Sequence, residues 1–600
     1  MDKIKTRDEQ SSKDKWNIEK IYKTIDEFNE DYNKLKKELD KLVKLEDNFL
    51  DNSTNFKDFF IQDEKVNRIL EKLSVYSNCK SDEDKSNSTY QSLAGKITNL
   101  YAEYNEKTAN IIPRMLKEDK NKILRYLEEE KELTSHKYPI ERILKEKEHT
   151  LSEEVEKVIS AYSPVLDSSY YTSSYLRNAD LKFDNIKDEN NKEVELTEAN
   201  YSIYIRSKDR SVRKDAFNKL YKSYKNLENT LTSTYNTTVT NDSITARLRN
   251  YNSSIEMYLK PKNIPITLYD NLIKVVRDNL DTLYEYYDLK KEILNLDEYH
   301  LYDSYVSIVK ENNKKYSFEE AKELVLNALS VYGDEYTNIL KTAFADGWID
   351  IYPNKGKRGG AYSTGSYDTL PYVLLNYTED YNDVSTLAHE LGHSMHTYLN
   401  NKANPYITAN YPIFLAEIAS TTNELLLSHY MYKNSNSKEE KLAILNEKLE
   451  LFKATIYRQT MFAEFEKIAH EHVDNGNVLT SDYLCDIYYK LNKEYFGDNV
   501  VVDEDIKYEW LRIPHFYTPF YVYQYATSLS IACYVYKNII NETPGFKDKY
   551  LNFLASGGKN YPLEVLKLID IDLCDTKVFE SALNDFKETL EEFKQVYNSK

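Results

Sequence analysis

Apolar positions recur at spacings of three and four through most of the first 350 residues, the pattern of helices that bury one face. In the clearest run, 20–45, the apolar residues fall on one side of a helix: Ile21, Ile25, Phe28, Tyr32, Leu35, Leu39 and Leu42. Similar stripes cover 93–111, 212–231 and 268–296. The pattern therefore predicts a mainly α-helical protein in which helices pack on helices.

The pattern changes at 352–377, where four of the chain's 13 glycines gather in YPNKGKRGGAYSTGSYDTLPYVLLNY. The glycines lack both the spacing and the following helix of a phosphate loop, so we expect a flexible loop. The short apolar run at 372–377 predicts a strand with an exposed edge. Such an edge can bind an extended peptide through main-chain hydrogen bonds. The polar run at 184–193 predicts another loop.

Composition supports the helical interpretation and excludes some partners. The 600 residues are 41% hydrophobic and include only 13 glycines and 13 prolines, so helix breakers are few. A net charge of −19 argues against nucleic acids and anionic membranes as partners. No signal peptide is visible, and the apolar stretches are too short to cross a bilayer. Four dispersed cysteines without a CxxC pair fit the reducing cytoplasm, the predicted location.

Three histidines and a glutamate gather in TLAHELGHSMH, residues 386–396, in a chain with 10 histidines. We expect a helix here with Asp383 as its N-cap. On it, His389 and His393 lie about 6 Å apart along the axis and about 40° apart around it, so both rings point to one side. That spacing suits two imidazoles on one zinc ion, and Glu390 can act as general base toward water. Coincidental HExxH matches occur, so a third ligand is needed as support.

A third candidate ligand, Glu417, lies in the run FLAEIA at 414–419, which is otherwise apolar or small. Burying a carboxylate there is costly unless it meets a cation, so we predict a zinc ligand; the alternative is a surface glutamate. Glu424, two turns further on the same face, either accepts a hydrogen bond from a ligand histidine or is solvated. His396 lies about 10 Å along the axis from His389, so it supports the site or packs but does not bind the metal. Structural roles are predicted for His429, His470 and His472.

At this point the chain resembles a known family. HELGHSMH followed 24 residues later by the glutamate of FLAEIAST resembles the M3 zinc peptidases, and closely their oligoendopeptidase F branch. Further matching blocks cover nearly the whole chain: KWNI, NKGKRGGAYS, PYVLLNY, MFAEFEKIAHE, IPHFYTPFYVYQYATS and SGGKNYP. The resemblance places the family's zinc ligands on His389, His393 and Glu417, with Glu390 as the base, and implies one zinc ion per chain.

The resemblance also implies an architecture. It is a mainly α, zincin-like fold with two lobes around a deep substrate channel and a small β element near the active site. A helical N-terminal lobe is expected at 1–200 and the catalytic domain at 201–600. The glycine loop and the strand after it are implied to bind substrate, through Gly359, Gly360, Tyr372, Val373 and Leu374.

The aromatic block at 513–528 is either a core segment or part of the active site. In the resembling family, a mobile loop here supplies a histidine and tyrosines to the transition state. Matching assigns these roles to His515, Tyr521 and Tyr525. The spacing differs by one residue from that of the thimet oligopeptidase branch, so Tyr523 stays an alternative.

The expected function is therefore that of a zinc endopeptidase that hydrolyses internal bonds of short oligopeptides. One alternative is a carboxypeptidase or dipeptidyl carboxypeptidase on the same scaffold, in which Arg358 or Arg512 would bind the substrate's C-terminal carboxylate. Another is an inactive helical scaffold that binds peptides. Short peptides are the predicted partners, and the sequence leaves the oligomeric state open.

Overall fold

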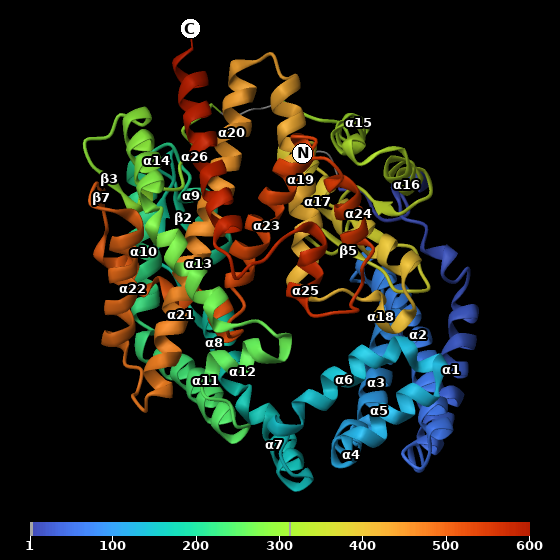
Figure 1. Cartoon of the computed structure of the whole chain (residues 1–600). Helices are drawn as coiled ribbons and strands as arrows, with labels where there is room; N and C mark the ends of the chain where they lie inside the picture. The colour runs from blue at the N-terminus through green and yellow to red at the C-terminus, as the bar shows by residue number, and fades with distance from the viewer. Residues whose placement is uncertain (1–3, 311–313, 600) are drawn as a thin grey trace. The chain divides into compact units, whose positions relative to one another are not determined.

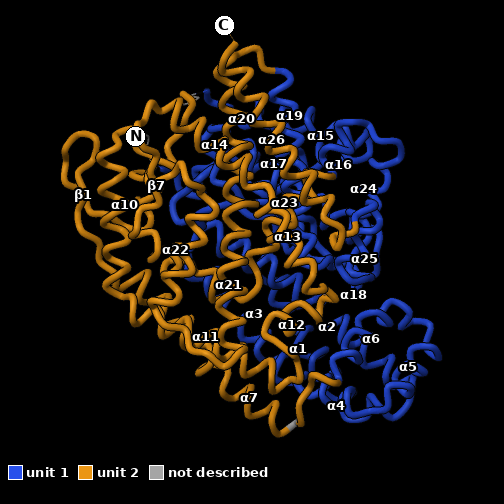
Figure 2. The backbone as a smooth tube through the Cα atoms, turned by 60° about the vertical axis from the view of Figure 1, so that its left-hand side comes forward, with its two compact units in different colours: residues 1–147, 313–434, 535–571 blue, residues 148–312, 435–534, 572–600 orange. Residues whose placement is uncertain are grey.

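The computed structural model describes residues 4–310 and 314–599 and consists mostly of α-helices (Figure 1). The prediction of a mainly α fold is confirmed. The chain divides into two compact units, each assembled from separate stretches of sequence (Figure 2). Unit 1 comprises Met1–Lys147, Asn313–Asn434 and Val535–Ile571, and unit 2 comprises Glu148–Asn312, Ser435–Tyr534 and Asp572–Lys600.

Unit 1 carries the helices of the N-terminal stretch and those around the histidine cluster. They are α1 (Ile25–Glu46), α2 (Ser53–Glu83), α3 (Ser88–Thr108), α4 (Ile111–Lys117), α5 (Lys120–Glu129), α6 (Lys137–Lys145), α15 (Phe318–Leu329), α16 (Asp334–Ala345), α17 (Tyr381–Ala403), α18 (Tyr406–Ala409), α19 (Ala416–Asn434), α24 (Phe546–Leu554) and α25 (Pro562–Leu566). Helix α23 (Tyr523–Ile540) begins in unit 2 and ends in unit 1.

Unit 2 carries the remaining helices. They are α7 (Glu153–Leu166), α8 (Ser168–Tyr175), α9 (Glu198–Tyr204), α10 (Arg210–Lys225), α11 (Glu228–Leu248), α12 (Ser254–Leu259), α13 (Ile266–Asp278), α14 (Leu280–Ile293), α20 (Lys438–Phe452), α21 (Arg458–Asp474), α22 (Ser481–Phe496) and α26 (Lys577–Asn598). Between α20 and α21 the helix continues through a π-helical turn, η10 (Lys453–Tyr457). No helix within the described ranges is both long and apolar enough to cross a membrane.

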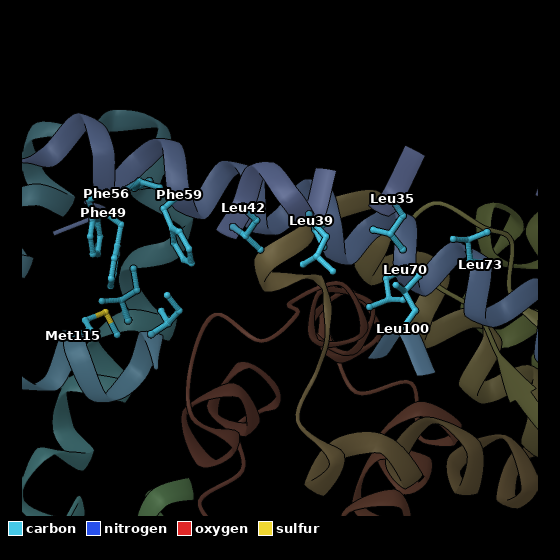
Figure 3. Close-up of a cluster of buried hydrophobic side chains, with 14 of the residues drawn as sticks. Leu35, Leu39, Leu42, Phe49, Phe56, Phe59, Leu70, Leu73, Leu100 and Met115 are labelled. Atoms are coloured by element: carbon cyan, nitrogen blue, oxygen red, sulfur yellow. The ribbon is translucent and has the colours of Figure 1, made fainter. Parts of the chain in front are cut away.

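The stripe predicted at 20–45 forms α1, which begins at Ile25 because the Thr24 side chain caps it. Its apolar face packs on α2 and α3 in the core of unit 1. Figure 3 shows Leu35, Leu39 and Leu42 on one side of α1, with Leu70 and Leu73 of α2 and Leu100 of α3 in the same buried cluster. The period of the stripe therefore predicted the buried face correctly, and the cap decided where the helix begins.

Two of the predicted stripes each form two helices. The run at 212–231 divides between α10 and α11 at Asn226 and Leu227, and the run at 268–296 divides between α13 and α14 at Asn279. Asn279 has a backbone φ of −121°, outside the helical region. An apolar stripe continues across such a break, so periodicity alone did not locate it.

The polar run at 184–193 includes strand residues. β1 (Asn185–Lys187) and β2 (Glu193–Glu195) pair antiparallel in unit 2, so the predicted loop is a β-hairpin whose turn alone is irregular. The strands are polar because their outward faces are exposed. A second small sheet pairs β3 (Tyr299–His300) with β7 (Val500–Val501) in parallel.

A three-stranded sheet in unit 1 lies beside the histidine helix. Its order is β4 (Ile349–Asp350), β6 (Tyr372–Leu374), β5 (Tyr362–Thr364), with β4 parallel and β5 antiparallel to β6. β6 is thus the central strand and is fully buried, so the predicted exposed edge at Tyr372, Val373 and Leu374 is wrong. Its continuous apolar run is typical of a strand covered on both faces. The half-buried β5 forms an edge of this sheet.

The N-terminal segment packs against this sheet. Trp16 lies edge-on against Tyr372, with ring centroids 6.2 Å apart, and its indole N–H donates to Glu83 at 2.8 Å. The Trp16 backbone N–H donates to Asp350 of β4 at 3.3 Å. The matching block at 15–18 therefore has a structural role, since it fixes the sheet against α2.

Candidate active site and metal centre

Helix α17 carries the histidine cluster and begins before the predicted start. Its N-cap is Asp380, whose Oδ1 accepts a hydrogen bond from the backbone N–H of Asp383 at 2.9 Å. The Asp383 carboxylate in turn accepts from the N–H of Asp380 at 3.3 Å. These reciprocal bonds form a capping box. The prediction of Asp383 as the N-cap is wrong because Asp383 is the second member of the box.

His389 and His393 lie on one face of α17, as their four-residue spacing predicts. Their Nε2 atoms are 3.2 Å apart, and the two rings are nearly perpendicular at 79°. Both side chains are half-buried, with 27% and 19% of their surface exposed. The pair therefore presents two nitrogen donors to one point in unit 1.

Glu417 supplies an oxygen at the same point. It is the second residue of α19, and its Oε2 lies 3.4 Å from Nε2 of His389 and 3.6 Å from Nε2 of His393. The side chain is 44% exposed, whereas Leu415 and Ile418 are buried. The prediction that Glu417 is buried is therefore wrong. The apolar residues beside it fill the core, while its carboxylate lies on a half-open side with the histidines.

These three atoms have the spacing that a zinc ion requires. They form a triangle with sides of 3.2, 3.4 and 3.6 Å. A point about 2.0 Å from each corner exists at its centre, and zinc lies about 2.0–2.2 Å from nitrogen and oxygen ligands. His389, His393 and Glu417 form the one group of this kind within the described residues. Two imidazoles and a carboxylate are also a donor set that catalytic zinc sites use.

Gly392 allows the two helices to come close enough for this arrangement. A Cβ at this position would lie 2.5 Å from Cα of Ser420, 2.7 Å from its nitrogen and 2.8 Å from the carbonyl oxygen of Ala419. Helix α17 therefore contacts the backbone of α19 directly, one turn after Glu417. Sequence reasoning missed this residue, although a glycine inside a helical motif is itself a sign of close approach.

Glu424 holds His389 from the side opposite the metal position. Its Oε1 lies 2.5 Å from Nδ1 of His389, and its Oε2 accepts from the Ser385 hydroxyl at 3.3 Å. Burial alone would lower the pKa of His389, but the hydrogen bond and negative charge of Glu424 outweigh it and raise the pKa to about 9. Because Nδ1 is engaged, Nε2 is the nitrogen left for a metal. Of the two alternatives for Glu424, the structure favours the hydrogen-bond acceptor.

Glu390 follows His389 on α17 and is buried, with 6% of its surface exposed. Its Oε2 has no hydrogen-bond partner among the described residues. Burial raises the pKa of Glu390 to about 7, although the His389 charge and a hydrogen bond from the Ser363 backbone oppose the rise. A buried carboxylate with one oxygen left over and a proton affinity near neutrality is suited to accept and return protons.

His396 packs instead of joining this group. It is buried, and its ring stacks on Tyr411 with centroids 3.6 Å apart and an angle of 7°. Burial lowers its pKa to about 3, so the ring is neutral. The structure thus gives His396 an aromatic environment, in line with the prediction that it does not bind the metal.

The predicted histidine and tyrosines of the aromatic block lie together in unit 2. The Tyr525 hydroxyl is 3.3 Å from Nε2 of His515, and the rings of Tyr521 and Tyr525 meet edge-on at 5.5 Å. All three side chains are half-buried. Tyr523 is fully buried against Tyr269, with ring centroids 5.1 Å apart, so it belongs to the core. The alternative of Tyr523 is therefore disfavoured.

Hydrogen bonds to other segments of the chain hold the glycine loop in place. The backbone N–H of Arg358 donates to the carbonyl of Asp82 at 3.0 Å, and the Asn376 side chain donates to the carbonyl of Gly360 at 2.7 Å. Gly360 has a φ of +81°, which glycine adopts readily. Gly359 and Gly360 are exposed, and a Cβ on either would meet nothing within 4 Å. They are available to a ligand, but no described contact assigns one.

The two arginines of the carboxypeptidase alternative are already paired. Arg358 lies 3.3 Å from Asp82, and Arg512 lies 2.6 Å from Glu198. Each guanidinium therefore has a carboxylate partner within the protein. This pairing weighs against either as a dedicated site for a substrate's C-terminus.

The three histidines for which structural roles are predicted contact other residues of the folded chain. His470 is buried and lies 3.1 Å from Asp242, and His429 lies 2.9 Å from the Tyr536 hydroxyl. His472 stacks on Tyr483 at 3.9 Å. These contacts support the structural roles predicted for them.

Comparison with known proteins gives a consistent result along the chain. A model described as Peptidase family M3 matches residues 203–585, and one described as Oligopeptidase F matches 115–183. Oligopeptidase PepF of Bacillus subtilis is 41% identical over 590 residues, covering 98% of this chain and 88% of that protein. Among solved structures, a Chlamydophila abortus protein aligns with a TM-score of 0.92 at 35% identity, covering 99% of this chain and 100% of the other. The oligoendopeptidase-F of Enterococcus faecium aligns with a TM-score of 0.74 at 34% identity, covering 96% and 99%.

Proposed function

This chain belongs to peptidase family M3, and from that membership we propose that it is a zinc-dependent endopeptidase that cuts internal bonds of short peptides. The observation that carries the proposal is the triangle formed by Nε2 of His389, Nε2 of His393 and Oε2 of Glu417. Three protein ligands leave a fourth position open, the arrangement of a catalytic zinc site. A bound zinc ion would polarise the scissile carbonyl and make water more acidic.

Glu390 is the proposed general base. Its partnerless Oε2 would take the proton of the attacking water and return it to the leaving amine. Burial supports this role because it raises the pKa of the carboxyl to about 7, where the group exchanges protons readily near neutral pH. Glu424 is a positioning residue in this scheme, since its hydrogen bond to Nδ1 fixes the ring of His389.

His515, Tyr521 and Tyr525 are proposed to stabilise the oxyanion of the tetrahedral intermediate. Their mutual contacts support a shared role, because an imidazole Nε2–H that donates to the Tyr525 hydroxyl would leave the hydroxyl's own proton free to donate to the oxyanion. The burial of Tyr523 supports leaving it out of this set.

We propose β5, not β6, as the strand that binds the extended peptide. β5 is an edge of its sheet, so its outer main-chain groups can pair with a substrate. It is also fixed to α17, because the Ser363 hydroxyl lies 2.8 Å from that of Ser394, the neighbour of His393. A peptide along β5 would therefore run beside the metal ligands, in a fixed register.

Organisation and location are part of the proposal. We propose a helical N-terminal lobe at 1–200 and a catalytic domain at 201–600, which the separate family matches at 115–183 and 203–585 support. The dispersed cysteines support a cytoplasmic site of action.

The test is hydrolysis of an internally quenched peptide that is blocked at both ends. The wild-type chain should cleave it, and Glu390→Gln should lower turnover by at least about 100-fold, the low end for a missing general base. Cleavage only of peptides with a free C-terminus would replace the endopeptidase by a carboxypeptidase. Near-normal turnover of Glu390→Gln would remove Glu390 from the mechanism.

A further inference from the structure

Unit 2 contains a cavity of about 220 Å³ whose lining includes none of the residues proposed for the peptidase reaction. Its walls come from α14, α20, η10, α21 and α22, together with the segments around Arg206 and Ser304. Much of the wall is apolar or aromatic, including Leu283, Tyr287 and Phe496. Arg206 and Ala454 are exposed, so the cavity can be reached from solvent. Cavities of about 150 Å³ hold benzene, so this one has room for an aromatic ring with a short polar arm.

A π-helical turn directs two cations into this cavity. The backbone N–H of Arg458 donates to the carbonyl of Lys453, which closes the five-residue turn of η10. Residues five apart in an α-helix point about 140° away from each other, whereas the π turn stacks them on one side. Lys453 and Arg458 consequently both line the cavity, with Ala454 and Tyr457 between them. Such turns often occur at functional sites.

The buried charges of the cavity do not balance. The ammonium groups of Lys290 and Lys453 both contact the single carboxylate of Glu450, and both donate to the carbonyl of Ser304 at 2.9 Å. Lys290 is 1% exposed and Lys453 is 8% exposed, so neither charge is well solvated. Arg458 has its own partner, Glu509, at 2.7 Å.

One buried positive charge is thus left over, in a chain whose net charge is −19. At the cavity entrance the charge of Arg206 is opposed by the nearby carboxylate of Glu447, so the surplus charge lies with the two lysines. Burying an uncompensated charge is unfavourable, and an anion that enters the cavity would neutralise it.

The cavity also holds an unused hydrogen-bonding group. Tyr457 is 1% exposed, and its hydroxyl has no partner among the described residues. Buried hydroxyls are ordinarily hydrogen-bonded, so one that lines a cavity invites a ligand atom as its partner.

We propose that this cavity is a binding site for a small organic carboxylate with an aromatic or branched aliphatic body. Lys453 would bind the carboxylate, the Tyr457 hydroxyl would donate to it, and Leu283, Tyr287 and Phe496 would cover the apolar body. A single negative charge matches the single surplus positive charge, and the apolar walls exclude a fully hydrated anion such as phosphate. The site lies in unit 2, whereas the metal ligands lie in unit 1.

The probe is 3-phenylpropionate, titrated by isothermal calorimetry into the full chain carrying His393→Ala. That background removes a proposed zinc ligand, so a carboxylate that binds zinc gives no signal and a failure of the proposed function does not affect the outcome. We expect binding of 3-phenylpropionate and much weaker binding of 3-phenylpropanamide, acetate and inorganic phosphate. A separate titration with N-acetylphenylalanine distinguishes peptide C-termini, which would bind more tightly, from simple aromatic acids. Either order supports a carboxylate site.

Three variants in the same background localise the binding. Lys453→Met should weaken it at least about tenfold, the effect of losing a charge-assisted hydrogen bond, and it leaves Lys290 with Glu450 as a balanced pair. Tyr457→Phe loses no hydrogen bond with a described residue in the free chain, so it should fold normally and weaken binding by about 2–10-fold. Lys467→Met, a lysine of α21 outside the cavity, is the matched control. Unchanged affinity in both cavity variants, equal binding of the amide, or no binding up to about 10 mM would overturn the proposal.

Discussion

Gly392 is the position at which one added methyl group tests how the metal centre is built. In Gly392→Ala the new Cβ would lie 2.5 Å from Cα of Ser420, with two further backbone atoms of α19 within 2.8 Å. Carbon atoms in contact prefer about 3.5–4.0 Å, so the helices must separate by about 1 Å. Backbone lines this contact, so no side chain can move aside.

A separation of that size is large for a metal site. Zinc ligands must keep their distances to within about 0.2 Å, and α19 carries Glu417 whereas α17 carries the histidines. We therefore expect Gly392→Ala to weaken zinc binding by at least about 10–100-fold, the range for disturbed metal sites. Overpacking should also lower the free energy of unfolding by about 1–3 kcal/mol.

The assay is a zinc titration against a competing chelator, together with denaturant unfolding followed by circular dichroism. Gly95→Ala is the matched control, because Gly95 lies within α3 of unit 1 and a Cβ there meets nothing within 4 Å. That change should leave zinc binding intact and stabilise the chain by about 0.5–1 kcal/mol. If Gly392→Ala bound zinc like the wild type, close contact of α17 and α19 would not determine the position of Glu417.

Three further predictions concern residues that support the site. Glu424→Ala should lower zinc affinity by about 10–100-fold in the same titration, and an unchanged affinity would show that the contact with Nδ1 of His389 is incidental. Asp380→Ala removes the cap of α17 and should lower the free energy of unfolding by about 1 kcal/mol in denaturant; equal stability would mean that the capping box contributes nothing. Glu466 accepts a hydrogen bond from the backbone N–H of Phe520. Phe520 has a φ of +51° and directly precedes Tyr521. Burial raises the pKa of Glu466 to about 8. The group is thus mostly protonated at pH 7, so Glu466→Gln should keep kcat while Glu466→Ala should lower it about tenfold through a misplaced loop; equal rates for the two variants would refute the positioning role.

Much of the fold followed from the spacing of apolar residues. The stripe at 20–45 identified the buried face of α1, because a helix on a core repeats with its own turn. The start of a helix depends instead on which side chain bonds the free N–H groups. Asp380 and Asp383 are both acceptable caps by type, and their reciprocal bonds become visible only in three dimensions.

The site was predictable where chemistry depends on local spacing. The four-residue spacing of His389 and His393 fixes their relation on any helix, and membership of family M3 confirms the prediction of a metalloendopeptidase. Glu417 was expected for the wrong reason: its run is apolar, but the residue itself is half exposed. Its approach to the histidines depends on Gly392, where α17 contacts the backbone of α19. The residue pattern along either helix does not reveal this contact.

The strand was misassigned for a related reason. A short apolar run such as 372–374 is compatible with an edge or a central strand, and only its partners decide. β4 and β5 lie on either side of β6, and β4 precedes β6 by more than 20 residues in the sequence. The cavity of unit 2 was equally hidden, because its cations converge through a π turn, for which periodicity gives no sign.

The central claim is that His389, His393 and Glu417 bind one zinc ion on which activity depends, while Glu390 does not bind it. The most direct measurement is the zinc content of the purified chain, determined by mass spectrometry without exposure to chelators. The account predicts about one zinc ion per chain in the wild type and in Glu390→Gln, and almost none in His393→Ala. A wild-type level of zinc in His393→Ala, or loss of zinc from Glu390→Gln in a folded chain, would contradict it.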